Sequence, residues 1–218
     1  MRLKKAHLAL TAAALLLPSL CWACDYSYRP STQLFEDASV IFVGKVVESP
    51  WKTDVTGKVS TTGKSRLRFS VEKKLRGIEE REVTLPPTNS DCSYPFLEGA
   101  TYLIHGVRTN GVVETGSPWR PLLIADATEA LKYVEQANAG KAPGLLYGVL
   151  SVAGNQANAT VQLEGRGGRF RAKATGGYYE IVAPPGEYRA WVEISGKKVS
   201  ARATVELIPG KATLQNLD

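Results

Sequence analysis

The sequence predicts a mainly β protein that consists of two domains. The 218-residue chain contains 20 glycines and 12 prolines, and its apolar residues mostly alternate with polar ones in short runs, a pattern typical of half-buried strands. Only residues 127–137 place apolar side chains at helical spacing, and a segment with glycine and proline, 138–144, follows them. We therefore expect a five-stranded barrel with one helix, followed by a seven-stranded antiparallel β-sandwich.

The first 23 residues have the pattern of a secretory signal peptide. A basic start precedes an apolar run over 8–17, and Cys21-Trp22-Ala23 places small residues at the two positions that a signal peptidase reads. The run is shorter than the ~20 residues that a membrane-spanning helix needs, and no other run is long enough. The sequence therefore predicts an exported protein, periplasmic or secreted, that begins at Cys24 and has no transmembrane segment.

Cleavage after Ala23 removes one cysteine and leaves Cys24 and Cys92. An even pair in an oxidising compartment predicts one disulfide. It would close a loop of about 68 residues, which the chain-entropy model values at ~4 kcal/mol. Lipid anchoring at Cys24 is not expected, because Cys21 and Trp22 stand where a lipobox has an aliphatic and a small residue.

The charge balance does not favour a nucleic-acid partner. The chain has 27 Lys and Arg against 21 Asp and Glu, and loss of Arg2, Lys4 and Lys5 with the signal lowers the net charge from +6 to +3. Residues 24–143 carry equal numbers of acidic and basic side chains and few aromatics. No basic groove with stacking aromatics is evident, so we expect no binding of nucleic acid.

The first domain should contain five strands and then the helix. The expected strands lie at 39–49, 66–77, 80–86, 101–107 and 111–115, and apolar and charged residues alternate in 66–77. Gly44 suggests a bend or bulge in the first run, residues 50–65 a polar loop, and Asn110-Gly111 a tight hairpin. Asp126 and Glu129 have the spacing of a capping box at the start of the helix. Five strands and a terminal helix fit a small barrel of the OB type.

The helix ends at a linker that predicts a domain boundary near residue 142. We expect a signal peptide over 1–23, a barrel over 24–142 and a sandwich over 143–218, and we expect the two domains to fold independently. Seven regularly spaced runs in the last segment predict the antiparallel sandwich. They cover 145–152, 159–165, 168–174, 177–183, 186–194, 197–208 and 211–217.

The first domain resembles the netrin-module family, which includes the tissue inhibitors of metalloproteinases. The resemblance is carried by Cys24, by DASVIFVGKV and FSVEKKLRG, and by CSYPFLEGATYLI from Cys92 onward, before the helix. It implies that the α-amine and carbonyl of Cys24 could chelate the zinc of a target metalloprotease, with Asp25 in the adjacent pocket. The candidate partner-binding residues are Cys24, Asp25, Tyr26, Ser93 and Tyr94.

This chain departs from the animal inhibitors at three places, one of which is GSPWRP after the fifth strand, where the partner of a second cysteine is missing. Tyr26 stands where a second cysteine would be, and Asp25 would put a carboxylate into a pocket that is usually apolar, which is costly. A disulfide that only pins the N-terminus to the barrel is therefore the competing interpretation of Cys24 and Cys92.

The second domain resembles the transthyretin-like sandwich known as the carboxypeptidase regulatory domain, through GVL, VQL, TGGYYEI and PPGEY. The resemblance implies a module that is appended to exported proteins and rarely does chemistry. Its basic residues could bind an anionic surface polymer or could form a solvated strand face. They are Arg166, Arg169, Arg171 and Lys173.

The sequence offers no catalytic motif. His105 is the only histidine after the signal, and GxSxG, HExxH and a phosphate-binding glycine loop are absent from the sequence. We therefore expect a protein without enzymatic activity, cofactor or metal of its own. The prediction is a binding or adaptor protein of the bacterial envelope or exterior with a protein partner, and the alternative is an inhibitor of an extracellular metalloprotease.

Overall fold

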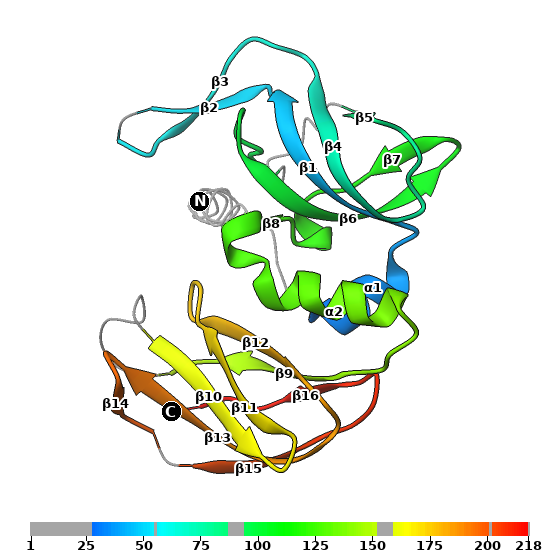
Figure 1. Ribbon diagram of the computed structural model, residues 1–218. Helices are drawn as coiled ribbons and strands as arrows, with labels where there is room; N and C mark the ends of the chain where they lie inside the picture. Colours follow the sequence, from blue (N-terminus) through cyan, green and yellow to red (C-terminus); the bar gives the residue numbers. More distant parts are fainter. Residues whose placement is uncertain (1–27, 55, 87–93, 152–158, 201, 218) are drawn as a thin grey trace, which may run out of the picture.

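The computed structural model describes residues 28–54, 56–86, 94–151, 159–200 and 202–217, and it confirms that the protein is mainly β (Figure 1). The described chain forms several sheets, most of them antiparallel, and two α-helices. We call residues 28–142 the N-terminal part and residues 143–217 the C-terminal part. No helix within the described ranges has the length and apolar character needed to cross a membrane.

The main sheet of the N-terminal part has the strand order β5-β4-β1-β6-β7, with β8 also paired to β6. It curls so that β5 approaches β7, and all five predicted strands are present in it. The assignment to the OB type remains a prediction. The strands are β1 (Val40–Glu48), β4 (Leu67–Arg76), β5 (Glu82–Leu85), β6 (Thr101–Thr109), β7 (Val112–Glu114) and β8 (Leu122–Leu123).

Two glycine positions in this sheet behave as their sequence context predicts. The register between β1 and β4 shifts between Val43 and Gly44, and a Cβ at Gly44 would lie 2.7 Å from the Phe42 ring. Asn110 and Gly111 both have positive φ, 51° and 83°, which a tight hairpin between β6 and β7 requires. Both local predictions are therefore confirmed.

The N-terminal part contains several elements that were not expected from the sequence, among them a hairpin and a short helix. The segment 50–65, expected as a polar loop, contains a short hairpin of β2 (Trp51–Thr53) and β3 (Val59–Thr61). A short helix, α1 (Ser31–Asp37), precedes the first strand. The guanidinium of Arg76 packs on the Phe35 ring at 3.5 Å and donates hydrogen bonds to the carbonyls of Phe35 and Ala38, so tertiary contacts stabilise α1.

The predicted helix is α2 (Thr128–Asn138), but its predicted capping box is wrong. Its N-cap residue is Ala127, and no side chain of the described residues makes a capping hydrogen bond. Asp126 belongs to a preceding 3-10 turn, η3 (Ile124–Asp126). The carboxylate of Glu129 accepts a hydrogen bond from the backbone N–H of Val182 at 2.6 Å instead, so a contact with the C-terminal part replaces the local cap.

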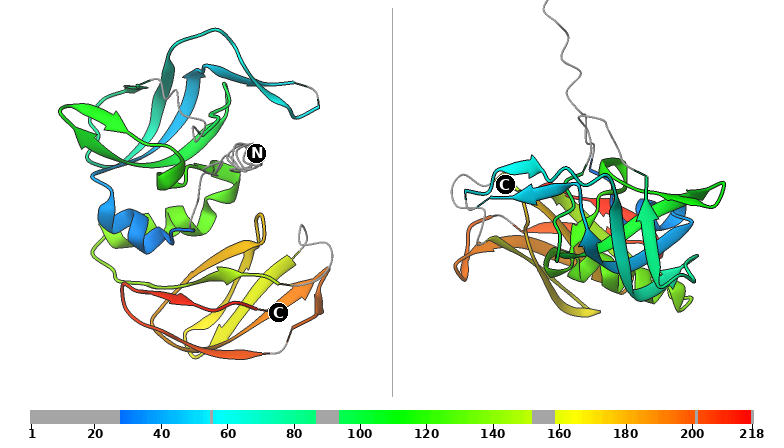
Figure 2. Two further views of the ribbon diagram at one scale, coloured as in Figure 1. Left: turned by 180° about the vertical axis from the view of Figure 1, so that it is seen from behind. Right: turned by 90° about the horizontal axis from the view of Figure 1, so that it is seen from above.

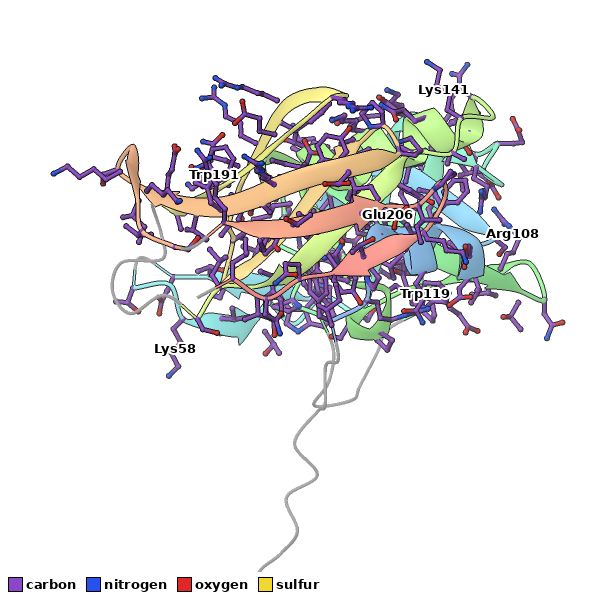
Figure 3. All side chains as sticks on the ribbon, turned by 90° about the horizontal axis from the view of Figure 1, so that it is seen from below. Lys58, Arg108, Trp119, Lys141, Trp191 and Glu206 are labelled. Atoms are coloured by element: carbon purple, nitrogen blue, oxygen red, sulfur yellow. The ribbon has the colours of Figure 1, made fainter. Side chains whose placement is uncertain are left out.

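The C-terminal part places two sheets around a shared apolar core, a sandwich-like arrangement. One sheet has the order β11-β10-β13-β14 with β15 paired to β13, and the other has the order β12-β9-β16. Leu163 and Val192 from the first sheet meet Leu146 and Ile181 from the second in this core. Seen from below, Trp191 and Glu206 lie on the outer face of the first sheet (Figure 3).

Two details differ from the predicted antiparallel sandwich. The run over 197–208 forms two strands, and β16 pairs with β9 in parallel. The strands are β9 (Gly144–Val149), β10 (Ala159–Gly165), β11 (Gly168–Lys173), β12 (Tyr178–Ala183), β13 (Gly186–Ile194), β14 (Lys197–Lys198), β15 (Ala203–Leu207) and β16 (Ala212–Leu214).

Both helices lie between the main N-terminal sheet and the C-terminal part, as Figures 1 and 2 show from opposite sides. A small core forms there from Tyr133 of α2, Leu145 of β9 and Val182 of β12, with Phe35 of α1 packed against it. The outer face of the β12-β9-β16 sheet is therefore covered by helices of the N-terminal part. Because the two parts share this core, we expect them to unfold together rather than independently.

Candidate functional site: a cleft between the two parts

A cleft of about 540 Å³ opens between the two parts of the chain, within the size range of small-ligand pockets. One side is formed by the segment from η2 (Ser117–Trp119) through η3 to the first turn of α2. The other side is the end of β11, from Arg171 to Lys173, and residues of β12 and Tyr28 complete the lining. The cleft therefore combines segments that are far apart in sequence.

A buried carboxylate, Glu180, joins the two parts beside this cleft. Its side chain is 7 % exposed. Its oxygens accept hydrogen bonds from the backbone N–H of Ser31 at 2.9 Å and from the Ser31 hydroxyl at 2.6 Å. Arg120 Nη2 lies 3.1 Å from Glu180 Oε1 and also donates to the Ser31 hydroxyl oxygen at 3.2 Å. We call Ser31, Arg120 and Glu180 the joint cluster.

The joint cluster fixes the position of β12 against the N-terminal part. Along β12, Tyr179 and Ile181 point into the C-terminal core, so Tyr178, Glu180 and Val182 point to the opposite face, as strand alternation requires. A buried charge is tolerated only when it is paired and hydrogen-bonded, and Glu180 obtains both from the N-terminal part. The cleft is thus held by a polar contact that neither part makes alone.

Three tyrosines stack next to the joint cluster. The Tyr28 ring is parallel to the Tyr178 ring, with centroids 4.7 Å apart, and lies 5.9 Å from the Tyr147 ring. The Arg120 guanidinium lies over Tyr28 at 4.5 Å. Burial, and secondarily the charge of Glu180, raises the pKa of Tyr28 well above its usual value, so this phenol stays neutral at physiological pH. Tyr28 and Tyr178 of this stack line the cleft and give it an aromatic surface.

Two of the predicted basic residues, Arg171 and Lys173, line the cleft. Both are exposed, and neither forms an ion pair with another residue in the described ranges. Arg169 lies on the same face of β11, because it precedes Arg171 by two residues, but it pairs with Glu164 at 2.6 Å. Arg166 is exposed in the turn between β10 and β11. The structure therefore brings two of the four residues to the cleft.

Two of the three described acidic residues that line the cleft have cationic partners. Glu180 belongs to the joint cluster. Glu129 lies 3.5 Å from Lys132 Nζ in addition to its bond with Val182, and burial raises its pKa. Asp126 is exposed, accepts a long hydrogen bond, 3.5 Å, from the neutral Thr175 hydroxyl, and forms no ion pair within the described ranges. Among the described residues, the lining thus has two cations, Arg171 and Lys173, and one carboxylate, Asp126, outside any ion pair.

His105 does not line the cleft. It lies on β6, is fully buried, and neither ring nitrogen has a hydrogen-bond partner in the described part of the chain. Burial, with smaller contributions from Arg120, Arg76 and Arg29, lowers its pKa to about 3. A neutral, enclosed imidazole is badly placed for proton exchange with a ligand. Among the described residues, no group of three or more His, Cys, Asp and Glu side chains could hold a metal ion.

Most residues of the predicted N-terminal edge lie outside the described residues: Cys24, Asp25, Tyr26, Cys92 and Ser93. The disulfide, the signal cleavage and any zinc-chelating role therefore remain predictions. Tyr94 is described. It packs against Phe96 at 4.8 Å and Tyr102 at 5.9 Å, and burial raises its pKa to about 12.

Sequence reasoning missed the joint cluster and the tyrosine stack. One signal was available, since Glu180 is the only charged residue in the otherwise apolar run YYEIVA. A carboxylate on such a strand needs a partner. Nothing in the sequence connects it to Ser31 or Arg120, which lie 149 and 60 residues away.

Comparison with known proteins adds no family assignment to this geometry. Neither a scan against protein-family models nor a search of curated proteins gives a match to this chain. The resemblances to the netrin module and to the transthyretin-like sandwich accordingly remain predictions from the sequence.

Proposed function

We propose that this protein is an exported binding or adaptor protein without enzymatic activity, which holds a protein partner in the cleft between its two parts. The observation that carries this proposal is the lining of the cleft. Tyrosine and arginine are enriched at protein interfaces, and the lining combines an aromatic stack with two exposed, unpaired cations.

The cleft is also pre-organised for binding. The joint cluster holds β12 through three hydrogen bonds from residues of the N-terminal part, and Glu129 and Lys132 add two bonds to the backbone of Val182. A site that is ordered before the partner arrives loses less conformational entropy on binding. We therefore expect binding without a large change in the shape of the protein.

A displayed library of random peptides tests the proposal. The library is selected on the immobilised mature protein, and the affinities of the enriched peptides are measured by fluorescence anisotropy. The variant Thr128→Trp fills the cleft from an exposed lining position. Thr53→Trp makes the same change at an exposed position on β2, away from the cleft. Enriched peptides should bind wild type and Thr53→Trp equally and lose affinity for Thr128→Trp. Equal binding to all three proteins, or no enrichment, contradicts the proposal.

The alternative function, inhibition of a metalloprotease through Cys24, has one supporting observation. Tyr28, four residues after Cys24, lines the cleft, so the described chain begins at the candidate site. A mature protein with one extra alanine before Cys24 should lose inhibition of a zinc protease, because the α-amine leaves the chelating position. The binding function in the cleft should survive this change.

A further inference from the structure

The strand β11 ends its sheet, and its free edge opens into the cleft. Among the strands of the described ranges, β10 alone is hydrogen-bonded to β11, and Arg171, Ala172 and Lys173 all contribute to the lining of the cleft. An unpaired strand edge presents backbone N–H and C=O groups that can pair with another chain. The cleft therefore contains backbone hydrogen-bonding groups as well as side chains.

The register of β11 identifies which residues present these groups. Ala174 N–H donates to the carbonyl of Ala159 at 3.0 Å, so these two residues form a hydrogen-bonded pair. Hydrogen-bonded and non-hydrogen-bonded pairs alternate along an antiparallel ladder. Lys173, opposite Thr160, and Arg171, opposite Gln162, are consequently in non-hydrogen-bonded pairs. Their N–H and C=O groups point away from β10, toward the free edge.

The same two residues carry the unpaired positive charges of the cleft. Arg171 and Lys173 are two positions apart and therefore on one face of the strand, ~7 Å from each other. A strand added along this edge would place its own residues opposite them, also two positions apart. Opposite charges in such cross-strand positions are favourable and like charges are unfavourable.

We infer that the partner contributes an extended, acidic segment that adds to the free edge of β11 as a further strand, with acidic side chains at alternate positions facing Arg171 and Lys173. The inference rests on the proposed binding function and specifies its ligand. Backbone hydrogen bonds to β11 would provide affinity, and the two cations would select acidic segments, which is the general logic of strand addition. The cations also disfavour pairing of β11 with β11 of a second copy, because like charges would then face each other.

Amide hydrogen exchange measured by NMR tests the backbone contact directly. The probe is a short synthetic peptide that alternates glutamate with valine or threonine, added to the mature protein. The N–H groups of Arg171 and Lys173 should exchange rapidly in the free protein and at least about tenfold more slowly in the complex. N-methylation of the peptide residues whose N–H groups face β11 should abolish binding. N-methylation of the intervening residues, whose N–H groups point away from β11, should not.

Charge reversal tests the selectivity. The double variant Arg171→Glu/Lys173→Glu should bind the glutamate peptide about tenfold or more weakly and gain affinity for the corresponding lysine peptide. The control Lys197→Glu/Lys198→Glu changes the net charge equally on β14, where both residues are exposed, and should leave the affinity unchanged. Circular dichroism checks that both variants fold.

The outcomes separate the inference from the proposed function. If library peptides bind in the cleft but leave the Arg171 and Lys173 amides unprotected, strand addition is wrong and the binding function stands. If an acidic polysaccharide such as alginate displaces the glutamate peptide and the amides are never protected, the basic residues serve an anionic polymer and the inference is wrong. If no peptide binds the cleft, both fail.

Discussion

Replacement of His105 by phenylalanine should remove much of the acid sensitivity of folding. His105 is fully buried, and its pKa is lowered to about 3, first by burial and then by Arg120, Arg76 and Arg29. In the unfolded chain an imidazole has a pKa of ~6.5. Between these two values the unfolded state binds one more proton than the folded state, so the free energy of unfolding falls as the pH falls.

The size of this effect follows from the pKa difference. One proton changes the free energy of unfolding by about 1.4 kcal/mol per pH unit, so a fall from about pH 6.5 to about pH 4.5 should cost the wild type roughly 2.5 kcal/mol through His105. Phenylalanine keeps an aromatic ring and has no titratable group, although its ring is larger than an imidazole. His105→Phe should lack this contribution; at neutral pH, the removal of two buried nitrogens without partners in the described part of the chain offsets the cost of packing the larger ring.

Urea unfolding at both pH values, followed by tryptophan fluorescence, measures the difference. Other titrating groups, including Glu129, are present in both proteins and cancel in the comparison. His105 is the only histidine after the predicted signal, so its ring proton in NMR spectra reports the titration directly and should not shift above about pH 4. Parallel loss of stability in wild type and His105→Phe, or a ring titration near pH 6.5, would refute the reasoning.

Three further changes test the joint, a turn and the predicted disulfide. Glu180→Ala should lower the free energy of unfolding by about 3–5 kcal/mol, because Arg120 is left buried without its partner; urea unfolding should change from one transition to two. Gly77→Ala should lower the free energy of unfolding by about 2 kcal/mol or more, measured by thermal unfolding, because φ is +58° and the new Cβ would lie 2.0 Å from the Ser39 carbonyl oxygen. In the control Gly57→Ala, φ is +82° but the Cβ would meet no atom within 4 Å, so the loss should be only about 1 kcal/mol. Cys92→Ser should cost ~4 kcal/mol, and Cys24→Ser the same, if the two are bonded; a free thiol at Cys92 in the unreduced protein would contradict this.

The strands could be predicted from sequence because their signal is local. The apolar run across 39–49, which is buried on both faces, and the alternation across 186–194 are both local patterns, and the corresponding strands β1 and β13 appear within one or two residues of the prediction. The hairpin at Asn110-Gly111 also depends on local backbone preference. Such features are decided by residues that are neighbours in sequence.

The candidate site could not be predicted in the same way. Asp126 and Glu129 match a capping box, yet Thr175 and Val182 of the C-terminal part bind these carboxylates instead. The basic residues of β11 were identified from sequence, but their function depends on which edge of the strand is unpaired and what lies across the cleft. Contacts between residues this far apart follow from the packing of the two parts, which no local pattern encodes.

The bond between Ser31 and Glu180 has a consequence for the order in which the chain can fold. It connects residues 149 positions apart. Closing so long a loop costs conformational entropy, and the contacts that offset this cost exist only after β12 has formed. During synthesis from the N-terminus, α1 and Tyr28 are made long before their partners on β12. They can therefore reach their buried positions only after β12 has formed, and a chain truncated before Tyr178 would leave them exposed to solvent and to proteases.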